Sequence, residues 1–261
     1  MTIEDVYVLG PSFECRKMTN QPLLGKSALV TGGARRVGRA IALGLARAGA
    51  DVAITFRTSA ADAAETVREI ENMGKRAMAI ECDVRSEASV RAAVMAVSDH
   101  FERLDVVVNN AAVFESAKLD HLSVEQWDVV FETNTRGPFL VAREALPALR
   151  ASQGRIVNIG SLGGIQAWAS HAHYCASKAA LHTLTQSMAK AFAPEVSVNC
   201  VVPGWIEFDE SDPAQAAHFR AKTPMQRNGS AEDVAQAVLF FATGPHFVTG
   251  QILAVDGGLG L

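Results

Sequence analysis

Short apolar runs alternate with longer helix-like stretches along almost the whole chain, and this alternation constrains the fold more than any other feature. The runs are nearly continuous in apolar and β-branched residues, which is typical of strands buried on both faces of a parallel sheet. We expect strands at residues 27–31, 51–56, 77–81, 104–109, 155–159, 196–201 and 252–255. We expect helices between them at residues 37–49, 60–73, 86–102, 123–150, 172–193 and 231–243.

Signals for helix ends agree with this alternation. Ser86, Ser123 and Ser230 each precede a stretch with an acidic residue or glutamine in its first turn, the pattern of a helix N-cap. Gly49 and Gly74 stand where two of the helices would stop. Strands and helices in this order predict an α/β fold, in which a doubly wound parallel sheet of about seven strands carries helices on both faces.

Length and charge limit the classes of protein to consider. The chain has 261 residues, and its regular pattern begins only near Leu24, so we expect one domain at 24–261 and an N-terminal extension at 1–23. The net charge is −4 and no long run of Lys and Arg occurs, so no nucleic-acid partner is expected. No uninterrupted apolar stretch is long enough for a membrane span, so no membrane partner is expected either.

Cysteine and histidine spacing argues against disulfides and metals. The chain has four widely separated cysteines, namely Cys15, Cys82, Cys175 and Cys200. Because they form no CxxC pair, we interpret them as reduced thiols of a cytoplasmic protein. His171 and His173 stand two residues apart without the paired spacing of metal ligands, so no metal site is expected.

A glycine-rich turn follows the first expected strand. Glycine lets the backbone approach a pyrophosphate, and the N-terminus of the following helix supplies N–H donors and positive potential. The turn therefore predicts a dinucleotide site, although a plain strand-to-helix corner would use glycines in the same way. The candidate cofactor contacts in it are Gly32, Arg35, Arg36, Val37 and Gly38.

The end of the second strand indicates which dinucleotide is bound. Enzymes that use NAD usually place Asp or Glu there, to hold the ribose 2′-hydroxyl. This chain has Arg57, Thr58 and Ser59 instead. Together with Arg35, they could hold a 2′-phosphate by charge-assisted hydrogen bonds, so NADP(H) is favoured over NAD(H). The alternative is that Arg57 is an ordinary solvated arginine.

Tyr174 and Lys178 are spaced four residues apart in an expected helix, so both side chains lie on one face. A tyrosine with its usual pKa of about 10 is a poor acid/base at neutral pH. A neighbouring ammonium favours the phenolate and lowers that pKa. We predict that Tyr174 is the acid/base and that Lys178 supports it and holds the nicotinamide ribose. The alternative is an amphipathic helix surface.

Three further polar positions would complete the site. Ser161 ends the fifth strand, where a hydroxyl can bind the substrate oxygen and stabilise developing charge. Asn134 lies inside the long fourth helix, where we expect it to interrupt the helix and position a water beside Lys178. The segment 109–112, with Asn110, Ala111 and Ala112, follows the fourth strand and would line the adenosine side of the cofactor.

Taken in order, these motifs resemble the series of the short-chain dehydrogenase/reductase family. The series is Thr31-Gly32 to Gly38, Asp83, Asn109-Asn110-Ala111, Asn134, Ser161, Tyr174, Lys178, Pro203-Gly204 and Asp256-Gly257-Gly258. The resemblance covers about 24–261 and implies a single-domain Rossmann-type fold, a Ser-Tyr-Lys-Asn tetrad and a homotetramer or homodimer. It also implies adenine contacts at Asp83 and Val84, and a nicotinamide near Pro203 and Gly204.

One departure points to a particular branch. Arg36 stands where the family usually has glycine, and this turn with Arg57 after the second strand resembles the pteridine reductases. Phe114 matches the position where that branch stacks a pterin ring. Ser161, however, occupies a position where the branch often has aspartate, and serine fits a simple carbonyl better.

Substrate specificity is expected in the segment after Pro203, from Trp205 to about Thr223. This segment is acidic, which argues against polyanionic substrates such as acyl carriers, and Pro213 suits the start of a small lid helix. Aromatic candidates for the substrate pocket are Phe114, Trp168 and Trp205.

The residues support three hypotheses. The first is an NADPH-dependent reductase of a small ketone or aldehyde, or of a 3-oxoacyl thioester, with Tyr174 as general acid. The second is a reductase of dihydropterin- or dihydrofolate-type substrates. The third is a non-catalytic NADP(H)-sensing protein, which would be expected to have lost Tyr174 or Lys178.

Overall fold

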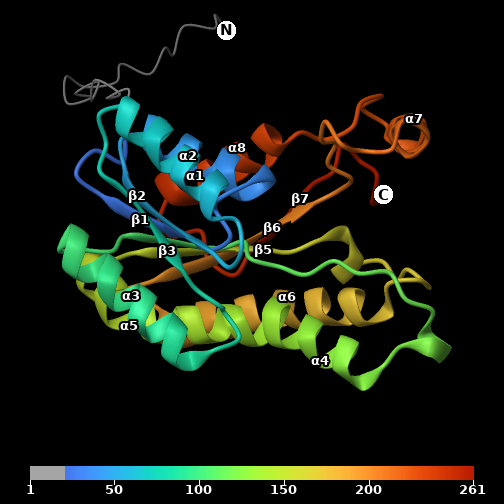
Figure 1. The fold of residues 1–261 in the computed structure, drawn as a ribbon, viewed down its shortest axis with the longest axis horizontal. Coiled ribbons are helices and arrows are strands. Elements are labelled where there is room, and N and C mark those ends of the chain that lie inside the picture. The colour runs from blue at the N-terminus through green and yellow to red at the C-terminus, as the bar shows by residue number, and fades with distance from the viewer. Residues whose placement is uncertain (1–20) are drawn as a thin grey trace, which may run out of the picture.

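Figure 1 shows the computed structural model, which describes residues 21–261. Seven parallel strands form one sheet in the order β3-β2-β1-β4-β5-β6-β7. The strands are β1 (Ser27–Val30), β2 (Asp51–Phe56), β3 (Ala77–Glu81), β4 (Val106–Asn109), β5 (Arg155–Ile159), β6 (Ser197–Pro203) and β7 (Ile252–Val255). The predicted doubly wound Rossmann-type sheet is therefore confirmed.

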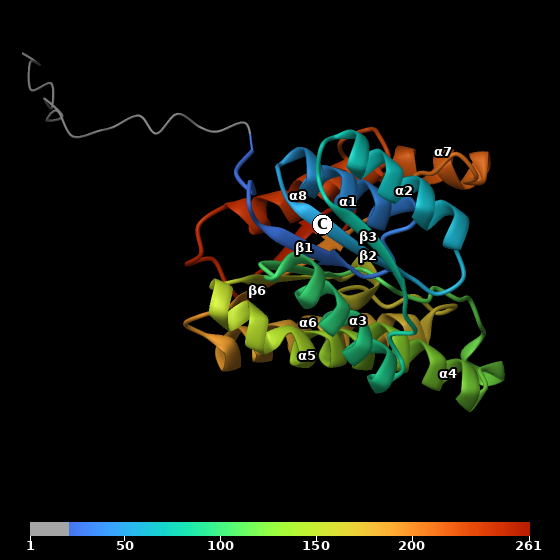
Figure 2. The same cartoon turned by 60° about the vertical axis from the view of Figure 1, so that its left-hand side comes forward.

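Helices cover both faces of the sheet, as Figures 1 and 2 show. One face carries α1 (Arg36–Arg47), α2 (Ala60–Asn72) and α8 (Ala231–Thr243). The other carries α3 (Glu87–Phe101), α5 (Gly137–Ser152) and α6 (Ala172–Phe192). In both views α4 (Val124–Phe131) and α7 (Pro213–Lys222) lie at the same end of the molecule, on opposite sides of the sheet.

The core is divided by the sheet into two apolar layers. Along β1, Ala28 and Val30 pack into the layer under α1 and α8, while Leu29 packs into the layer under α3 and α5. Successive side chains of a strand point to opposite faces, so a strand between two helical layers must be apolar at every position. This explains the unbroken apolar runs in the sequence.

The helix ends follow the predicted signals. The side chains of Ser86, Ser123 and Ser230 accept hydrogen bonds from backbone N–H groups in the first turns of α3, α4 and α8. Gly49 and Gly74 take positive φ angles of 107° and 76° directly after α1 and α2. Both sets of predicted helix boundaries are confirmed.

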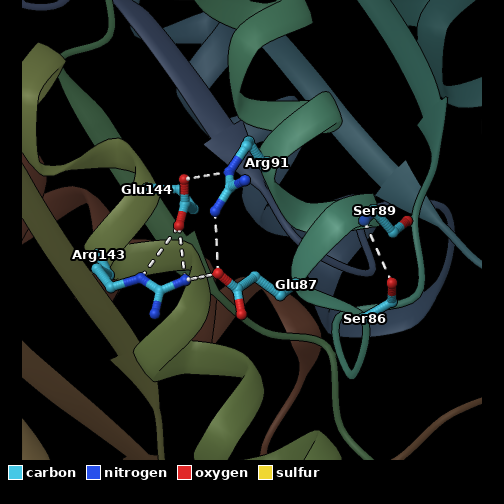
Figure 3. Close-up of polar contacts among 6 residues, drawn as sticks. All are labelled: Ser86, Glu87, Ser89, Arg91, Arg143 and Glu144. Atoms are coloured by element: carbon cyan, nitrogen blue, oxygen red, sulfur yellow. Dashed lines mark hydrogen bonds and ion pairs between the residues drawn. The ribbon is translucent and has the colours of Figure 1, made fainter.

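A group of four charged side chains joins α3 to α5, as Figure 3 shows. Arg91 lies between Glu87 and Glu144, with N–O distances of 2.9 and 3.3 Å, and Arg143 contacts the same two carboxylates at 2.7 Å. Most of these side chains are about half exposed, and water therefore screens the attraction between them. We expect the group to contribute little to the free energy of unfolding, although it links α3 to α5.

The packed chain begins before Leu24. Leu23, the last residue of the expected extension, is buried against α1, and its backbone N–H donates to the carbonyl of Ala48 at 2.8 Å. Residues 1–20 of that extension lie outside the described residues. Within residues 21–261, no helix is long and apolar enough to cross a membrane.

Candidate active site

The strands of the sheet end at one cavity of about 1310 Å³, which loops from both halves of the sheet enclose. Ligands of open parallel sheets bind at this edge, where the connections diverge to the two faces. The cavity brings together all the predicted site residues except Asn109 and Asn134. They are Gly32, Arg35, Arg36, Val37, Gly38, Arg57, Thr58, Ser59, Asp83, Val84, Asn110, Ala111, Ala112, Phe114, Ser161, Trp168, Tyr174, Lys178, Pro203, Gly204 and Trp205.

The glycine-rich turn is shaped by the loop after β4. The Asn110 side-chain amide donates to the carbonyl oxygens of Thr31 and Gly32, both at 3.0 Å. A Cβ on Gly38 would lie 2.5 Å from Asn110 Nδ2 and would overlap the Gly32 carbonyl oxygen. Only glycine at position 38 lets α1 start this close to the turn, with its first N–H groups at the cavity.

The end of the cavity beside β2 has groups suited to the 2′-phosphate on the adenosine of a dinucleotide. Arg35 and Arg57 line it with Thr58 and Ser59, so two guanidinium groups and two hydroxyls stand beside the end of β2. The Arg35 Nε lies 3.6 Å from the carboxylate of Asp62, and both side chains are largely exposed, which leaves the guanidinium accessible to a phosphate. With the open N-terminus of α1, these groups supply what a dinucleotide requires.

Asp83 reaches the same region in a fixed orientation. The Arg85 guanidinium donates to both of its carboxylate oxygens, with its shortest contact at 2.6 Å. This hydrogen bonding, with the nearby positive charge, holds the pKa of Asp83 below its usual range. Asp83 is therefore a fixed acceptor at the cavity wall.

Tyr174 and Lys178 face the cavity from α6, and both are almost completely buried. Burial raises the pKa of Tyr174 to about 12, although a hydrogen bond with the Ser161 hydroxyl opposes the shift. Burial lowers the pKa of Lys178 to about 8, and its Nζ donates to the carbonyl of Ile159 at 2.7 Å. We expected the pKa of Tyr174 to be lowered by Lys178, but in this structure it is raised, with the desolvation of the buried phenol as the largest cause.

Ser161 is held at the end of β5 by its own turn. Its hydroxyl accepts a hydrogen bond from the N–H of Gly163 at 3.1 Å, at the start of the short 3₁₀ turn Leu162–Gly164. The residue is buried and lines the cavity with Tyr174. The arrangement presents two hydroxyl groups to one point in the cavity.

Asn134 lies at a break in the long helix and outside the cavity lining. The expected helix at 123–150 is interrupted there by a π-helical turn, Glu132–Arg136, between α4 and α5, and so the predicted interruption is confirmed. The side chain, however, is fully buried away from the cavity. It exchanges two hydrogen bonds with the backbone of Val113, at 2.8 and 2.9 Å, and donates to Ser177 Oγ at 3.1 Å. Its amide therefore joins the β4 loop to α6, and the positioning of a water beside Lys178 stays a prediction.

Asn109 differs from its expected role. Its side chain is buried beneath the cavity and donates to Asn158 Oδ1 at 2.8 Å. Asn158 in turn donates to Thr185 Oγ1 at 2.9 Å. Asn109 thus connects β4 to β5 and α6, and only Asn110, Ala111 and Ala112 of the 109–112 segment line the cavity.

Comparison with known proteins places this site in a family. Residues 32–260 match the family model described as enoyl-(acyl carrier protein) reductase. A 3-oxoacyl-[acyl-carrier-protein] reductase from Synechocystis sp. is 35% identical over 241 residues, which cover 91% of this chain and 98% of that protein. The chain belongs to the short-chain dehydrogenase/reductase family.

Solved structures of relatives agree closely with the fold. A short-chain dehydrogenase from Burkholderia cenocepacia J2315, solved with NADP, is 40% identical with a TM-score of 0.87, covering 92% of this chain and all of its own. A blue fluorescent protein from a metagenomic library, solved with NADPH, is 36% identical with a TM-score of 0.85, covering 92% of this chain and 99% of its own. The chain is therefore an oxidoreductase of this family.

Arg36, where the family usually has glycine, links the two halves of the cavity in this short-chain dehydrogenase/reductase. Its backbone keeps the left-handed conformation that favours glycine, with φ of 50°. Its guanidinium lies 2.6 Å from the carboxylate of Glu210 and 5.2 Å from the centre of the Phe208 ring. Arg36 thus connects the cofactor turn to the segment that precedes α7.

Aromatic rings surround Tyr174 on the substrate side. Phe114 meets the Tyr174 ring edge-on at 4.8 Å between centroids and stacks on His171 at 4.6 Å. Trp168 lies parallel to Tyr174 at 6.3 Å, and Trp205 stacks on Phe219 at 5.2 Å. All six rings line the cavity, so its wall offers planar aromatic surfaces to a substrate.

The predicted start of a helix at Pro213 is confirmed by α7, whose role as a lid stays a prediction, but the sequence analysis missed the residues that α7 directs into the cavity. They are Gln215, His218, Phe219 and Lys222. Their spacing of three, four and seven residues is that of one helix face, and this signal was present in the sequence. Among residues 21–261, no group of three or more His, Cys, Asp or Glu side chains is gathered as metal ligands would be.

Proposed function

We propose that this protein is an NADP(H)-dependent oxidoreductase that reduces a carbonyl group to an alcohol, with Tyr174 as the general acid. The observation that carries the proposal is the arrangement of Tyr174, Ser161 and Lys178 in the cavity that also holds the dinucleotide-type turn. Carbonyl reduction is what the name of the Synechocystis relative describes. The preference for NADP(H) is supported by Arg35 and Arg57, and by the two solved relatives that hold NADP or NADPH.

The roles of the side chains follow from their chemistry. Pro203 and Gly204 would hold the nicotinamide of the cofactor, which when bound would supply a hydride to the carbonyl carbon. Ser161 donates a hydrogen bond to the carbonyl oxygen and stabilises the charge that develops on it. Tyr174, which its raised pKa keeps protonated at neutral pH, transfers its proton to that oxygen and completes the alcohol. The Lys178 ammonium stabilises the resulting phenolate and contacts the nicotinamide ribose.

Other features of the protein stay predictions. Ser161 is the residue that favours a carbonyl over a pterin substrate, while Phe114 at the cavity wall is the feature shared with the pteridine reductases. The homotetramer or homodimer and the cytoplasmic location are expectations that follow from the sequence and the family. A non-catalytic sensing role is a poor fit, because the chain keeps both Tyr174 and Lys178.

A substrate panel tests the proposed function. Oxidation of NADPH and of NADH is followed at 340 nm with aldehydes, ketones, a 3-oxoacyl thioester, dihydrobiopterin and dihydrofolate. We expect turnover of one or more carbonyl compounds, faster with NADPH than with NADH. Turnover of the dihydropterins alone would favour pteridine reduction, and cofactor binding without turnover of any compound would favour the sensing protein.

Arg57 offers a test of cofactor choice. Exchange of Arg57 for Asp removes a charge-assisted contact with the 2′-phosphate and adds a repulsive charge, so kcat/KM for NADPH should fall by about 100-fold. The value for NADH should change by no more than about threefold, since NADH lacks that phosphate. The matched control is Arg68→Asp, an exposed charge reversal on α2 outside the cavity. Equal losses with both cofactors in Arg57→Asp would contradict the assignment.

A further inference from the structure

The acidic side chains of the segment before α7 do not line the cavity. The sequence analysis took the acidity of this segment as an argument against polyanionic substrates, and their positions remove that argument. Glu210 pairs with Arg36, and Glu207 accepts a hydrogen bond from Asn228 at 2.7 Å. Asp212 caps α7 by accepting from the N–H of Gln215 at 2.8 Å. None of these three side chains, nor that of Asp209, lines the cavity. The acidity of the segment is therefore directed elsewhere.

The charge that does line the cavity is almost entirely positive. Among the described residues, Asp83 is the only acid in the lining, and it is held by Arg85 at the adenosine end. The cations in the lining are Arg35, Arg36, Arg57, Lys178 and Lys222, and the histidines are His171 and His218. The field in the cavity thus favours an anion, beyond the phosphates of the dinucleotide.

Lys222 is the one cation of the described cavity lining to which the proposed reaction assigns no role. Arg35 and Arg57 are assigned to the 2′-phosphate, Arg36 is paired with Glu210, and Lys178 lies beside Tyr174. Lys222 forms no ion pair with any residue in the described part of the chain, whereas its neighbour Arg220 pairs with Glu207 on the other side of α7. His218 precedes Lys222 by one helical turn and lines the same cavity.

The same face of α7 also carries an apolar surface. Phe219 stacks on Trp205 between the positions of His218 and Lys222, and both rings line the cavity. A substrate with its carbonyl at Ser161 and Tyr174 would therefore contact aromatic rings along its body and cations at α7. The substrate that would match these groups has three parts: a carbonyl, a planar or apolar body and an anionic end.

We propose that Lys222, assisted by His218, is a specificity-determining residue that binds a carboxylate on the substrate, so that the preferred substrates are oxo acids with a planar or apolar body. The inference rests on the proposed carbonyl reduction and deepens it. The ammonium of Lys222 donates to the carboxylate while the carbonyl at the opposite end receives the proton from Tyr174. Aldehydes and ketones without the anionic group enter the same cavity but lose this contact.

A pair of matched substrates tests the carboxylate site. The probes are 4-formylbenzoate and its methyl ester, which share the aromatic aldehyde and differ in charge. The wild-type protein should prefer the acid by about tenfold in kcat/KM, mainly through KM, as expected for one charge-assisted contact made by an exposed lysine. In Lys222→Gln, kcat/KM for the acid should fall by about tenfold, while kcat/KM for the ester should change by less than about twofold. Lys222→Arg should keep most of the preference.

Two controls separate the site from its alternatives. Lys190→Gln removes one exposed charge from α6 outside the cavity and should leave the preference unchanged. Binding of 4-formylbenzoate can be followed without turnover by quenching of tryptophan fluorescence, since Trp168 and Trp205 line the cavity. Its Kd should rise by about tenfold in Lys222→Gln. Acetoacetyl-coenzyme A and the neutral acetoacetyl-N-acetylcysteamine distinguish a phosphate from a carboxylate as the preferred anion.

The outcomes are distinct. Reduction of the acid and the ester at equal rates, with no effect of Lys222→Gln, overturns the carboxylate site and leaves carbonyl reduction standing. A raised KM for NADPH in Lys222→Gln, with the acid preference intact, assigns Lys222 to the cofactor and overturns the inference. A preference for the coenzyme A thioester over its neutral analogue, without one for 4-formylbenzoate, replaces the carboxylate with a phosphate and overturns it also. Weakened acid binding in Lys222→Gln without turnover of any carbonyl supports the anion site and overturns the proposed function.

Discussion

Replacement of Tyr174 by phenylalanine should lower kcat for carbonyl reduction by about 10²- to 10⁴-fold, the contribution typical of a positioned general acid. The substitution removes one oxygen from a ring that Phe114 and Trp168 hold in place, so the aromatic contacts remain. The phenol is the proposed proton donor, and with its pKa raised by burial to about 12 it is protonated at neutral pH. Without it the alkoxide that forms beside Ser161 has no acid in contact, and the barrier rises.

The measurement is steady-state reduction of the best carbonyl from the panel. Binding of NADPH, followed by its fluorescence, and the thermal midpoint serve as controls, and both should stay close to the wild-type values. Phe is chosen over Ala because Ala would leave a cavity next to Phe114. The loss of packing could then lower activity as much as the loss of the phenol oxygen. A Tyr174→Phe variant that keeps more than a tenth of the wild-type kcat would remove Tyr174 from the mechanism.

Exchange of Gly160 for alanine should reduce activity by about 100-fold through a displacement of Ser161. Gly160 directly precedes Ser161, and a Cβ there would overlap the buried His182 ring and lie 2.8 Å from Cys200 Sγ. Closely packed interiors accommodate such an atom only by shifting the backbone, at a cost of about 1 to 3 kcal/mol in stability. The shift falls on Ser161, the residue proposed to bind the substrate oxygen. Activity and the thermal midpoint should therefore fall together.

A second substitution tests whether the clash is the cause. His182→Ala removes the overlapping ring, so the double variant Gly160→Ala/His182→Ala should recover at least tenfold of the lost activity. Gly164→Ala is the matched control. Its Cβ would also overlap His182, but it would lie 2.8 and 2.9 Å from backbone atoms of Lys178 and Ala179, which no side-chain change relieves. Equal recovery in both pairs, or in neither, would show that steric contact with His182 does not position the Ser161 loop.

Much of the site could be predicted because it depends on local spacing. The glycine-rich turn, the i, i+4 pair of Tyr174 and Lys178, and Ser161 at a strand end are each defined within a few residues. A parallel sheet then brings strand ends to one edge, so local motifs from distant segments meet without any knowledge of the packing. For the same reason the residues of α7 were missed: their helical spacing was visible, but the face directed into the cavity depends on how α7 docks.

The sequence by itself determined the order of strands and helices along the chain, the edge of the sheet where the cavity lies and most of the motif residues that line it, because apolar periodicity and turn chemistry are properties of neighbouring residues. Only the tertiary structure decided how the polar groups are used. Asn134 gives its amide to Val113, and Arg36 reaches Glu210, which is 174 residues away. Burial, rather than the charge of Lys178, sets the pKa of Tyr174. Desolvation and long-range hydrogen bonds depend on the whole packed chain, and no local pattern contains them.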